Sequence, residues 1–312
     1  MSGSTSRPAL WMLSGAMAFT VMGAFTHALG PRCDWLIVAL VRTLFMFLTS
    51  AGMAIALGVR LSAFDPPRLW VRSLAGTVSL LCNFFALARL PMADAVTLSN
   101  LYPLWIVLTS SIVLRRPPTL AEAVGLLCAL AGVVVIERPD LDVDRWAALA
   151  ALGSSVSTAV AMFGLHRLRN VDSRAVVAHF GAVGALVVGV SSCFRPASSW
   201  YGLFVPGTAA LLLGVGVAGT IGQVFLTKAY AAGVPARISV ISLSQVAFAM
   251  GLDIWLWGRD LDAVTLAGFA LVLGPTAWLT ARGGAKHWLR TQEATAGPVT
   301  LDASPAFFSE EN

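Results

Sequence analysis

Residues 90–108 read LPMADAVTLSNLYPLWIVL, a stretch that has the length of a membrane span but includes side chains that such a span normally avoids. About 20 apolar residues in a helix cross the roughly 30 Å hydrocarbon core of a bilayer. Polar side chains and proline are tolerated at that depth only where protein or water meets them. Such residues in this stretch include Asp94, Thr97, Ser99, Asn100 and Pro103. We therefore expect a membrane helix with one face that serves something other than lipid contact.

The composition indicates an integral membrane protein. Of the 312 residues, 57% are hydrophobic and 12% are charged, whereas soluble domains have about 45–50% and about 25%. The net charge of +5 is typical of cytoplasmic loops enriched in Lys and Arg. Because no run of five basic residues occurs, we expect no nucleic-acid partner. The expected partners are the lipid bilayer and a small-molecule substrate, and a homodimer is left open.

The sequence contains no pattern for a catalytic residue, a metal or a cofactor. Its four cysteines show no CxxC spacing and predict neither a zinc site nor a disulfide framework. No HExxH, GxSxG or P-loop motif occurs, and no GxGxxG motif precedes a soluble nucleotide-binding domain. We therefore expect neither an enzyme nor an ATP-driven pump.

Apolar windows of membrane-spanning length recur along the chain, separated by short breaks such as GPRCD from residue 30 and RRPP from residue 115. They predict an all-α integral membrane protein with ten transmembrane helices. The spans lie near residues 9–29, 35–58, 69–88, 91–114, 119–136, 146–165, 174–194, 204–229, 236–257 and 262–281. The polar residues 282–312 are expected to form a disordered cytoplasmic tail.

The distribution of Lys and Arg between the loops predicts the orientation. With both termini in the cytoplasm, 14 basic residues, Arg72 among them, fall on the cytoplasmic side and 6 on the opposite side, and Arg42 remains inside a span. Because cytoplasmic loops carry the excess of Lys and Arg, this orientation is favoured. We expect a multi-pass protein of the cytoplasmic (inner) membrane with both termini in the cytoplasm.

The chain resembles itself when one copy is shifted so that Ala75 meets Ala218, a shift that we call the repeat offset. Ala75-Gly76-Thr77 then aligns with Ala218-Gly219-Thr220, and residues 75–132 share ten identities with residues 218–275. The spans and breaks keep the same register. The repeat offset predicts two five-helix repeats, at residues 9–136 and 146–281. Since five is odd, the second repeat must enter the membrane from the opposite side, which is the inverted topology typical of secondary transporters.

The run from Ala86 to Pro139 resembles the EamA-like family of the drug/metabolite transporter superfamily. The matching motifs are LPxADA at 90–95, a polar stretch with proline at 99–103, a basic turn with prolines at 115–118, and GxxxxxxGVxxI at 125–136. The run from Lys228, KAYAAGVPARISVISLSQVAFAM, is similar to that family's later repeat. The resemblance covers residues 9–281, and it implies a ten-helix, two-repeat fold with a central cavity that moves small metabolites or drugs.

Two positions depart from the family pattern. The turn at 115–118 reads RRPP where a glutamate is usual, and Gln245-Val246 replaces the usual proline in the second repeat. Both departures bear on the substrate subgroup rather than on the fold.

Nine polar residues inside the spans are expected to line a substrate cavity: Arg42, Asn83, Thr97, Ser99, Asn100, Tyr102, Gln223, Ser242 and Gln245. Pro103 has no N–H to donate to the carbonyl of Ser99, so the helix should kink there. Two roles remain open for Asn100, cavity lining or a hydrogen bond between helices. Arg42 either pairs structurally, for example with Asp253, or attracts an anionic substrate group.

These features predict a secondary transporter that carries a small organic metabolite or drug across the cytoplasmic membrane by alternating access. The alternative is a membrane-embedded receptor or enzyme on the same helical frame. An enzyme should concentrate acids, histidines or a nucleophile at depth, whereas Asp253, His27 and His179 are dispersed along the sequence.

Overall fold

Helices are the only regular elements in the part of the chain that the computed structural model describes, which is residues 6–61, 67–87, 89–90, 92–113, 115, 117–137, 144–258 and 262–281. In chain order the helices are α1 Ser6–Leu29, α2 Trp35–Ala56, α3 Pro67–Leu87, α4 Met92–Ser99, α5 Tyr102–Val113, α6 Leu120–Glu137, α7 Arg145–His166, α8 Ser173–Cys193, the 3-10 helix η1 Ala197–Phe204, α9 Thr208–Ala232, α10 Pro235–Ser242, α11 Ser244–Trp257 and α12 Ala263–Ala281. The predicted tail, 282–312, lies outside the described residues.

Eight segments within the described ranges are long and apolar enough to cross a membrane, compared with the ten that the sequence predicts. Two of the eight combine a pair of short helices, α4 with α5 and α10 with α11. The predicted spans at 119–136 and 262–281 correspond to α6 and α12, whose apolar parts, Leu120–Ile136 and Ala263–Trp278, are shorter. The helical fold class is confirmed, and the count of ten full-length spans is not reached.

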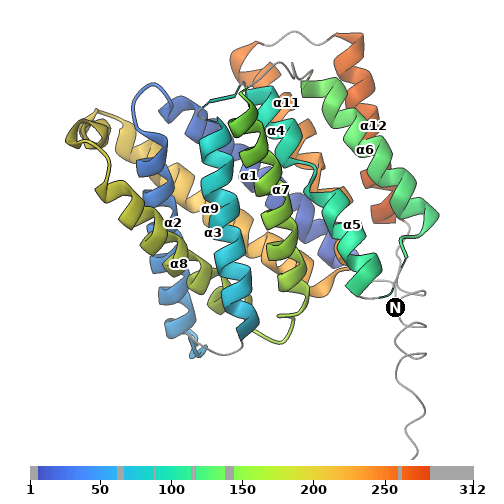
Figure 1. The fold of residues 1–312 in the computed structure, drawn as a ribbon, viewed down its shortest axis with the longest axis horizontal. Coiled ribbons are helices and arrows are strands. Elements are labelled where there is room, and N and C mark those ends of the chain that lie inside the picture. The colour runs from blue at the N-terminus through green and yellow to red at the C-terminus, as the bar shows by residue number, and fades with distance from the viewer. Residues whose placement is uncertain are drawn as a thin grey trace, which may run out of the picture.

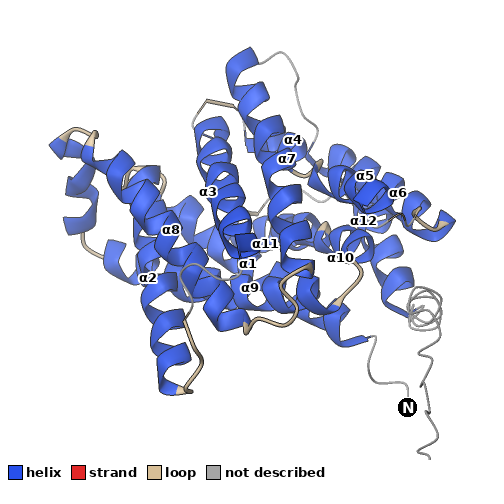
Figure 2. Ribbon diagram, turned by 60° about the horizontal axis from the view of Figure 1, so that its bottom comes forward, coloured by secondary structure: helices blue, strands red, loops and turns tan. Residues whose placement is uncertain are grey.

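The long helices pack in pairs that are far apart in sequence. The most extensive contacts join α1 to α9, α3 to α7, α2 to α8, and α6 to α12. Figure 1 shows α2 and α8 at one side of the molecule, α6 and α12 at the other, and α3 and α7 between them, and Figure 2 shows the same order from another direction. Many large apolar side chains stay exposed, for example Leu186 at 69% and Ile112 at 77%. Such an apolar exterior fits contact with lipid.

Small residues let α1 and α9 approach closely. A side-chain carbon at Gly214 would lie 2.7 Å from the ring of Phe25, and one at Gly222 would lie 2.9 Å from the ring of Phe19. These two glycines and the buried Ala218 between them recur every four residues along one face of α9. This small-xxx-small spacing is the usual basis of tight packing between membrane helices.

All five acidic side chains that the structure describes hold the beginning of a helix. Each accepts a hydrogen bond of 2.8–2.9 Å from a backbone N–H near a helix N-terminus, where a carboxylate also favours the helix dipole. They are Asp34, Glu122, Asp144, Asp172 and Asp262. Glu122 forms a capping box with Thr119 before α6. The described carboxylates therefore lie at helix ends, away from the middle of the spans.

Two spans are interrupted at matching places. Helix α4 ends at Ser99 and α5 begins at Tyr102, so the interruption falls where the sequence predicts a kink. Pro103 is the second residue of α5, a position where the missing N–H costs no helical hydrogen bond. Helix α10 ends at Ser242 and α11 begins at Ser244. The repeat offset carries both ends of α4 onto the two ends of α10, so the first short helix of each interrupted span has the same bounds.

Candidate functional site

A cavity of about 580 Å³ lies between the two interrupted spans and helices α1, α2, α3, α7, α8 and α9. Ligand pockets in proteins commonly have volumes of about 300–1,000 Å³. Seven of the nine predicted site residues line it: Arg42, Asn83, Ser99, Asn100, Tyr102, Gln223 and Gln245. No Asp or Glu of the described residues is among its lining. The cavity is large enough for a small organic molecule.

One end of the cavity is sealed by buried apolar residues, which we call the closing cluster. It contains Ala9, Met12, Ala16, Leu69, Ile106, Ala159, Ala161, Met162, Leu165, Leu168, Val176, Ala229, Tyr230, Ile238 and Ile241. Ala161 and Met162 also line the cavity, so the cluster forms its floor. Along α1 the cluster takes residues 9–16, and the cavity follows from Phe19 to His27. The cavity therefore extends toward the C-terminal end of α1.

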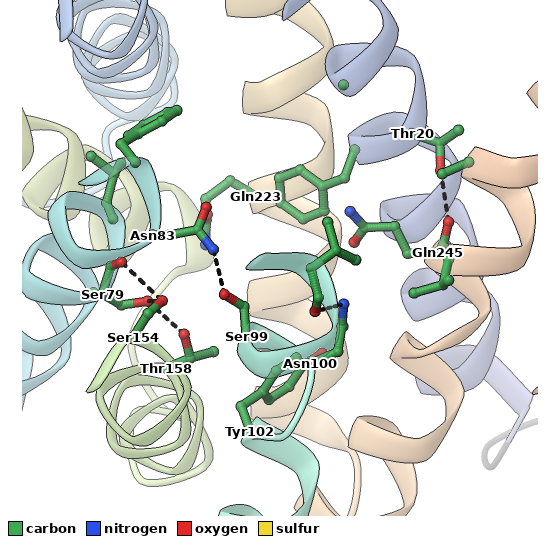
Figure 3. A pocket seen from close by; sticks show the side chains of 18 of the residues that line it. Thr20, Ser79, Asn83, Ser99, Asn100, Tyr102, Ser154, Thr158, Gln223 and Gln245 are labelled. Carbon is green, nitrogen blue, oxygen red and sulfur yellow. Dashed lines mark hydrogen bonds between the residues drawn. The ribbon is translucent and has the colours of Figure 1, made fainter. Parts of the chain in front are cut away.

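Helices α3 and α4 place a chain of amides and hydroxyls on one wall. The Nδ2 of Asn83 donates to the Oγ of Ser99 over 2.8 Å, and the Nδ2 of Asn100 donates to the carbonyl of Val96 over 2.9 Å (Figure 3). Asn100 thus lines the cavity and bonds within its own helical turn, which leaves its amide oxygen to face other partners. The interruption after Ser99 turns these polar groups toward the cavity.

A second polar group, on α3 and α7, is one that the sequence reasoning missed. The Ser79 hydroxyl lies 2.5 Å from the Thr158 hydroxyl and 3.2 Å from the Ser154 hydroxyl, and all three residues line the cavity (Figure 3). The signal is present in the run GSSVST at 153–158, inside a predicted span. Hydroxyls that satisfy one another in this way still retain acceptor positions for a bound solute.

Tyr102 joins the two interrupted spans at the cavity floor. Its hydroxyl forms a short hydrogen bond with the hydroxyl of Ser242, which itself donates to the carbonyl of Ser239 over 2.6 Å. Ser242 is buried and does not line the cavity, contrary to the prediction. The reason is that α10 packs into the closed end of the molecule, where the Ser242 hydroxyl contacts Tyr102 rather than open space.

Two glutamines from the second half of the chain also line the cavity. Gln223 on α9 is 4% exposed, and its Nε2 has no hydrogen-bond partner among the described residues. Gln245 on α11 lies beside α1, where the Thr20 hydroxyl donates to the Gln245 carbonyl over 3.4 Å. Figure 3 shows both glutamines around the same space as Asn83 and Asn100. Because a buried donor without a partner costs free energy, the Gln223 amide is available to a ligand.

Thr97 is not among the residues that line the cavity, contrary to the prediction. It is buried, and its hydroxyl has no hydrogen-bond partner among the described residues. Val96, Ser99 and Asn100 line the cavity. Since each residue advances about 100° around an α-helix, Thr97 points away from the face centred on Val96.

Arg42 on α2 lines the cavity, and its guanidinium lies 6.0 Å from the ring centre of Phe19. Its Nε is buried without a hydrogen-bond partner among the described residues. An arginine inside a span costs about 2.5–3.5 kcal/mol on insertion scales, so a compensating interaction is required. The side chain of Asp253, the partner suggested by the sequence, lies outside the described residues.

Arg72 on α3 is the principal residue that the sequence reasoning misplaced. The loop count assigns it to the cytoplasmic side, but it is 1% exposed and lines the cavity. Its guanidinium lies 4.3 Å from the ring centre of Phe180, and its Nε and Nη1 have no hydrogen-bond partner among the described residues. The sequence offers one indication of this position: Arg72 lies four residues before Gly76, the glycine of the repeated Ala-Gly-Thr motif.

No group of three or more His, Cys, Asp or Glu residues in the described part of the chain could hold a metal ion. His179, one of the dispersed histidines, bonds through Nδ1 to the Ser73 hydroxyl over 2.8 Å, which joins α8 to α3. The described part of the site is therefore a cavity whose wall combines apolar side chains, such as Phe84 and Phe180, with amides, hydroxyls and two arginines.

Comparison with known proteins agrees with this architecture. The profile of the EamA-like transporter family matches residues 6–138. The pseudopaline exporter CntI of Pseudomonas aeruginosa strain UCBPP-PA14 is 31% identical over 222 residues, which cover 69% of this chain and 75% of the exporter. The chain belongs to the EamA-like transporter family. It is a multi-pass membrane protein, and its relatives support a role in membrane transport.

A more distant relative and a solved structure also match the chain. An uncharacterized transporter of Helicobacter pylori strain J99 is 27% identical over 212 residues, which cover 66% of this chain and 70% of that protein. A solved crystal structure superposes with a TM-score of 0.76 at 23% identity and covers 91% of this chain and 99% of its own. The fold of this EamA-like protein is therefore shared along nearly its whole length.

Proposed function

We propose that this protein is a secondary transporter that moves a small organic solute through the described cavity by alternating access. The observation that carries the proposal is a cavity of about 580 Å³, with amides, hydroxyls and two arginines on its wall, that lies between two interrupted spans and ends on an apolar floor. Discontinuous helices at the interface of two repeats are where secondary transporters bind their substrates. The transporter names of the relatives support the same class of function.

We further propose that residues 9–136 and 146–281 are two inverted five-helix repeats. The repeat offset carries the start of α6 onto the start of α12, and the start of α4 onto that of α10. The main packing pairs also exchange: α1 with α9 becomes α7 with α3, whereas α2 with α8 and α6 with α12 map onto themselves. Contacts that map onto themselves when the halves are exchanged are expected of a pseudo-two-fold arrangement.

In the proposed orientation both termini are cytoplasmic and the protein lies in the cytoplasmic membrane. Removing Arg72 from the count of 14 leaves 13 basic residues on the cytoplasmic side against 6 on the other, so the positive-inside rule still favours this orientation. The cavity then opens outward beside His27, and the closing cluster is the cytoplasmic gate. The relative named as an exporter supports movement of the solute out of the cell.

The test is flux into liposomes that contain only the purified full-length protein. Vesicles are incubated with a bacterial metabolite extract under a proton gradient, a sodium gradient or neither, and the contents of the lumen are identified by mass spectrometry. We expect one chemical class to accumulate beyond the level in protein-free vesicles. If no solute accumulates under any gradient while extract components still bind the protein, the receptor alternative replaces the transporter.

A further inference from the structure

Two arginines reach the same cavity from neighbouring helices. Arg42 is on α2 and Arg72 is on α3, and both line the cavity. Arginine keeps its proton in proteins, so both side chains carry a positive charge there. Among the described residues, the cavity wall carries these two positive charges and no carboxylate.

The duplicated Ala-Gly-Thr motif makes room for both arginines. A side-chain carbon at Gly76 would collide with the Nη1 of Arg72 and would lie 2.8 Å from the Phe180 ring. A side-chain carbon at Gly219, its counterpart at the repeat offset, would lie 3.2 Å from the Nε of Arg42 and 3.0 Å from the sulfur of Met22. Each copy of the motif thus provides a bare backbone surface against which one guanidinium rests. The same arrangement of a glycine beside an arginine therefore occurs at both copies of the motif.

Neither guanidinium is neutralised by a described side chain. The Nε of Arg42 and the Nε and Nη1 of Arg72 are buried without hydrogen-bond partners, and the five described carboxylates cap helices elsewhere. The rings of Phe180 and Phe19 offer cation–π contact at 4.3 Å and 6.0 Å, which supplies attraction but no hydrogen-bond acceptor. Oxyanions are the ligands that match the fork of donors on a guanidinium.

The two charges lie at different depths. Arg72 follows Leu69 of the closing cluster by less than one helical turn. Arg42 contacts the middle of α9 near Gly219 and lies close to Phe19, where α1 passes from the closing cluster to the cavity. The pair is therefore arranged along the cavity rather than around a single point.

We propose that the transported solute is an elongated molecule with two anionic groups, such as a dicarboxylate, one bound by Arg42 and the other by Arg72. The amides of Asn83, Asn100 and Gln223 line the same cavity and can hydrogen-bond the body of the solute. This substrate class rests on the proposed transport function. It also accounts for two buried charges whose cost the described residues do not offset.

The experiment measures thermal stabilisation of the purified full-length protein in a chloride-poor buffer. The probes are the straight-chain dicarboxylates from malonate to suberate, with the corresponding diamides and monocarboxylates at the same concentration. A ligand that binds only the folded state raises the unfolding temperature. We expect at least one dicarboxylate to raise it by several degrees more than its diamide. If no member of the series exceeds its diamide, the proposal is overturned.

Variants assign the effect to the two arginines. Arg42→Gln and Arg72→Gln should each reduce the dicarboxylate effect to that of a monocarboxylate, and Arg42→Lys and Arg72→Lys should keep part of it. Arg174→Gln is the matched control, because Arg174 lies at a helix start beside Asp172 and outside the cavity. An effect of equal size in both Gln variants and the control would overturn the assignment. Where a Gln variant does not fold, the Lys variant and the wild-type comparison with diamides still decide.

The stabilisation and vesicle experiments distinguish a wrong substrate class from a wrong transport function. Dicarboxylate stabilisation without accumulation in vesicles would leave the anion site standing and overturn transport. Accumulation of neutral or cationic solutes only, with no dicarboxylate effect, would leave transport standing and overturn the substrate class.

Discussion

The two interrupted spans have the same design but different surroundings. The interruption between α4 and α5 turns Ser99, Asn100 and Tyr102 toward the cavity. The interruption between α10 and α11 is buried, since Ser239, Ser242, Leu243 and Ser244 are all less than 4% exposed. One break therefore faces open space while its counterpart packs in the closed end. Equivalent segments in unlike surroundings are expected when a two-repeat transporter is caught with one side open.

The comparison also shows that proline is not the common cause of the two interruptions. Pro103 follows the first break, whereas its counterpart at the repeat offset is Val246, and the second span is nevertheless interrupted at Leu243. A proline is thus not required for the interruption. The side chains at the break differ: Asn100 on the cavity wall corresponds to Leu243, which lies in an apolar cluster with Val107, Val240 and others.

The largest expected effect in this comparison is that of Leu243→Asn. The substitution removes a fully buried side chain and leaves an amide among apolar residues, so the free energy of unfolding should fall by about 2–4 kcal/mol. A lower unfolding temperature of the purified protein would report it. A variant as stable as the wild type would contradict the view that the second break is closed and apolar.

The reverse exchange, Asn100→Leu, should act on transport instead. It removes an amide from the cavity wall and one hydrogen bond within its own turn, so stability should change by no more than about 1 kcal/mol. Flux of the solute found in the vesicle assay should fall about five- to tenfold, the equivalent of roughly one hydrogen bond. Thr97→Val is the control, because Thr97 is buried off the cavity, and its flux should stay near wild type. Unchanged flux in Asn100→Leu would assign Asn100 to helix packing.

The smallest expected effect is that of Pro103→Ala. Since Pro103 occupies the second position of α5 and the other span breaks without proline, stability should change by less than about 1 kcal/mol. Flux should remain close to wild type. A large loss of stability or of flux would indicate that Pro103 causes the first interruption.

Much of this architecture could be predicted from the sequence, because membrane spans and a repeat leave strong one-dimensional signals. The repeat offset anticipates the matching bounds of α4 and α10. Side-chain direction was harder to predict. Arg72 sits near a span end, where a basic residue is usually an interfacial anchor, but α3 turns it inward. Thr97 and Asn100 are three residues apart in the sequence, but only Asn100 lines the cavity. The position of the cavity relative to α4, which the sequence does not give, decides this difference.

The polar groups of α7 show a second reason why the sequence did not predict every residue of the site. Ser154 and Thr158 meet Ser79 because α3 packs along α7, and sequence patterns do not give the pairing of helices. Similarly, Ser242 corresponds to Ser99 at the repeat offset, yet its hydroxyl bonds to Tyr102, whereas Ser99 lines the cavity and accepts a hydrogen bond from Asn83. The repeat offset predicts which residues are equivalent, and the packing around each of them determines which one lines the cavity.

The most direct test of alternating access uses that same asymmetry. The repeat offset relates the bonded pair Tyr102 and Ser242 at the closed end to the pair Gln245 and Ser99, both of which line the cavity. Ser99→Cys and Gln245→Cys are introduced together after the four native cysteines are replaced, and flux is measured before oxidation, after oxidation and after reduction. A disulfide requires the two β-carbons to come within about 4.5 Å. We predict that oxidation joins the pair and stops flux, and that reduction restores it. Continued flux with the pair fully cross-linked would contradict transport by alternating closure of this cavity.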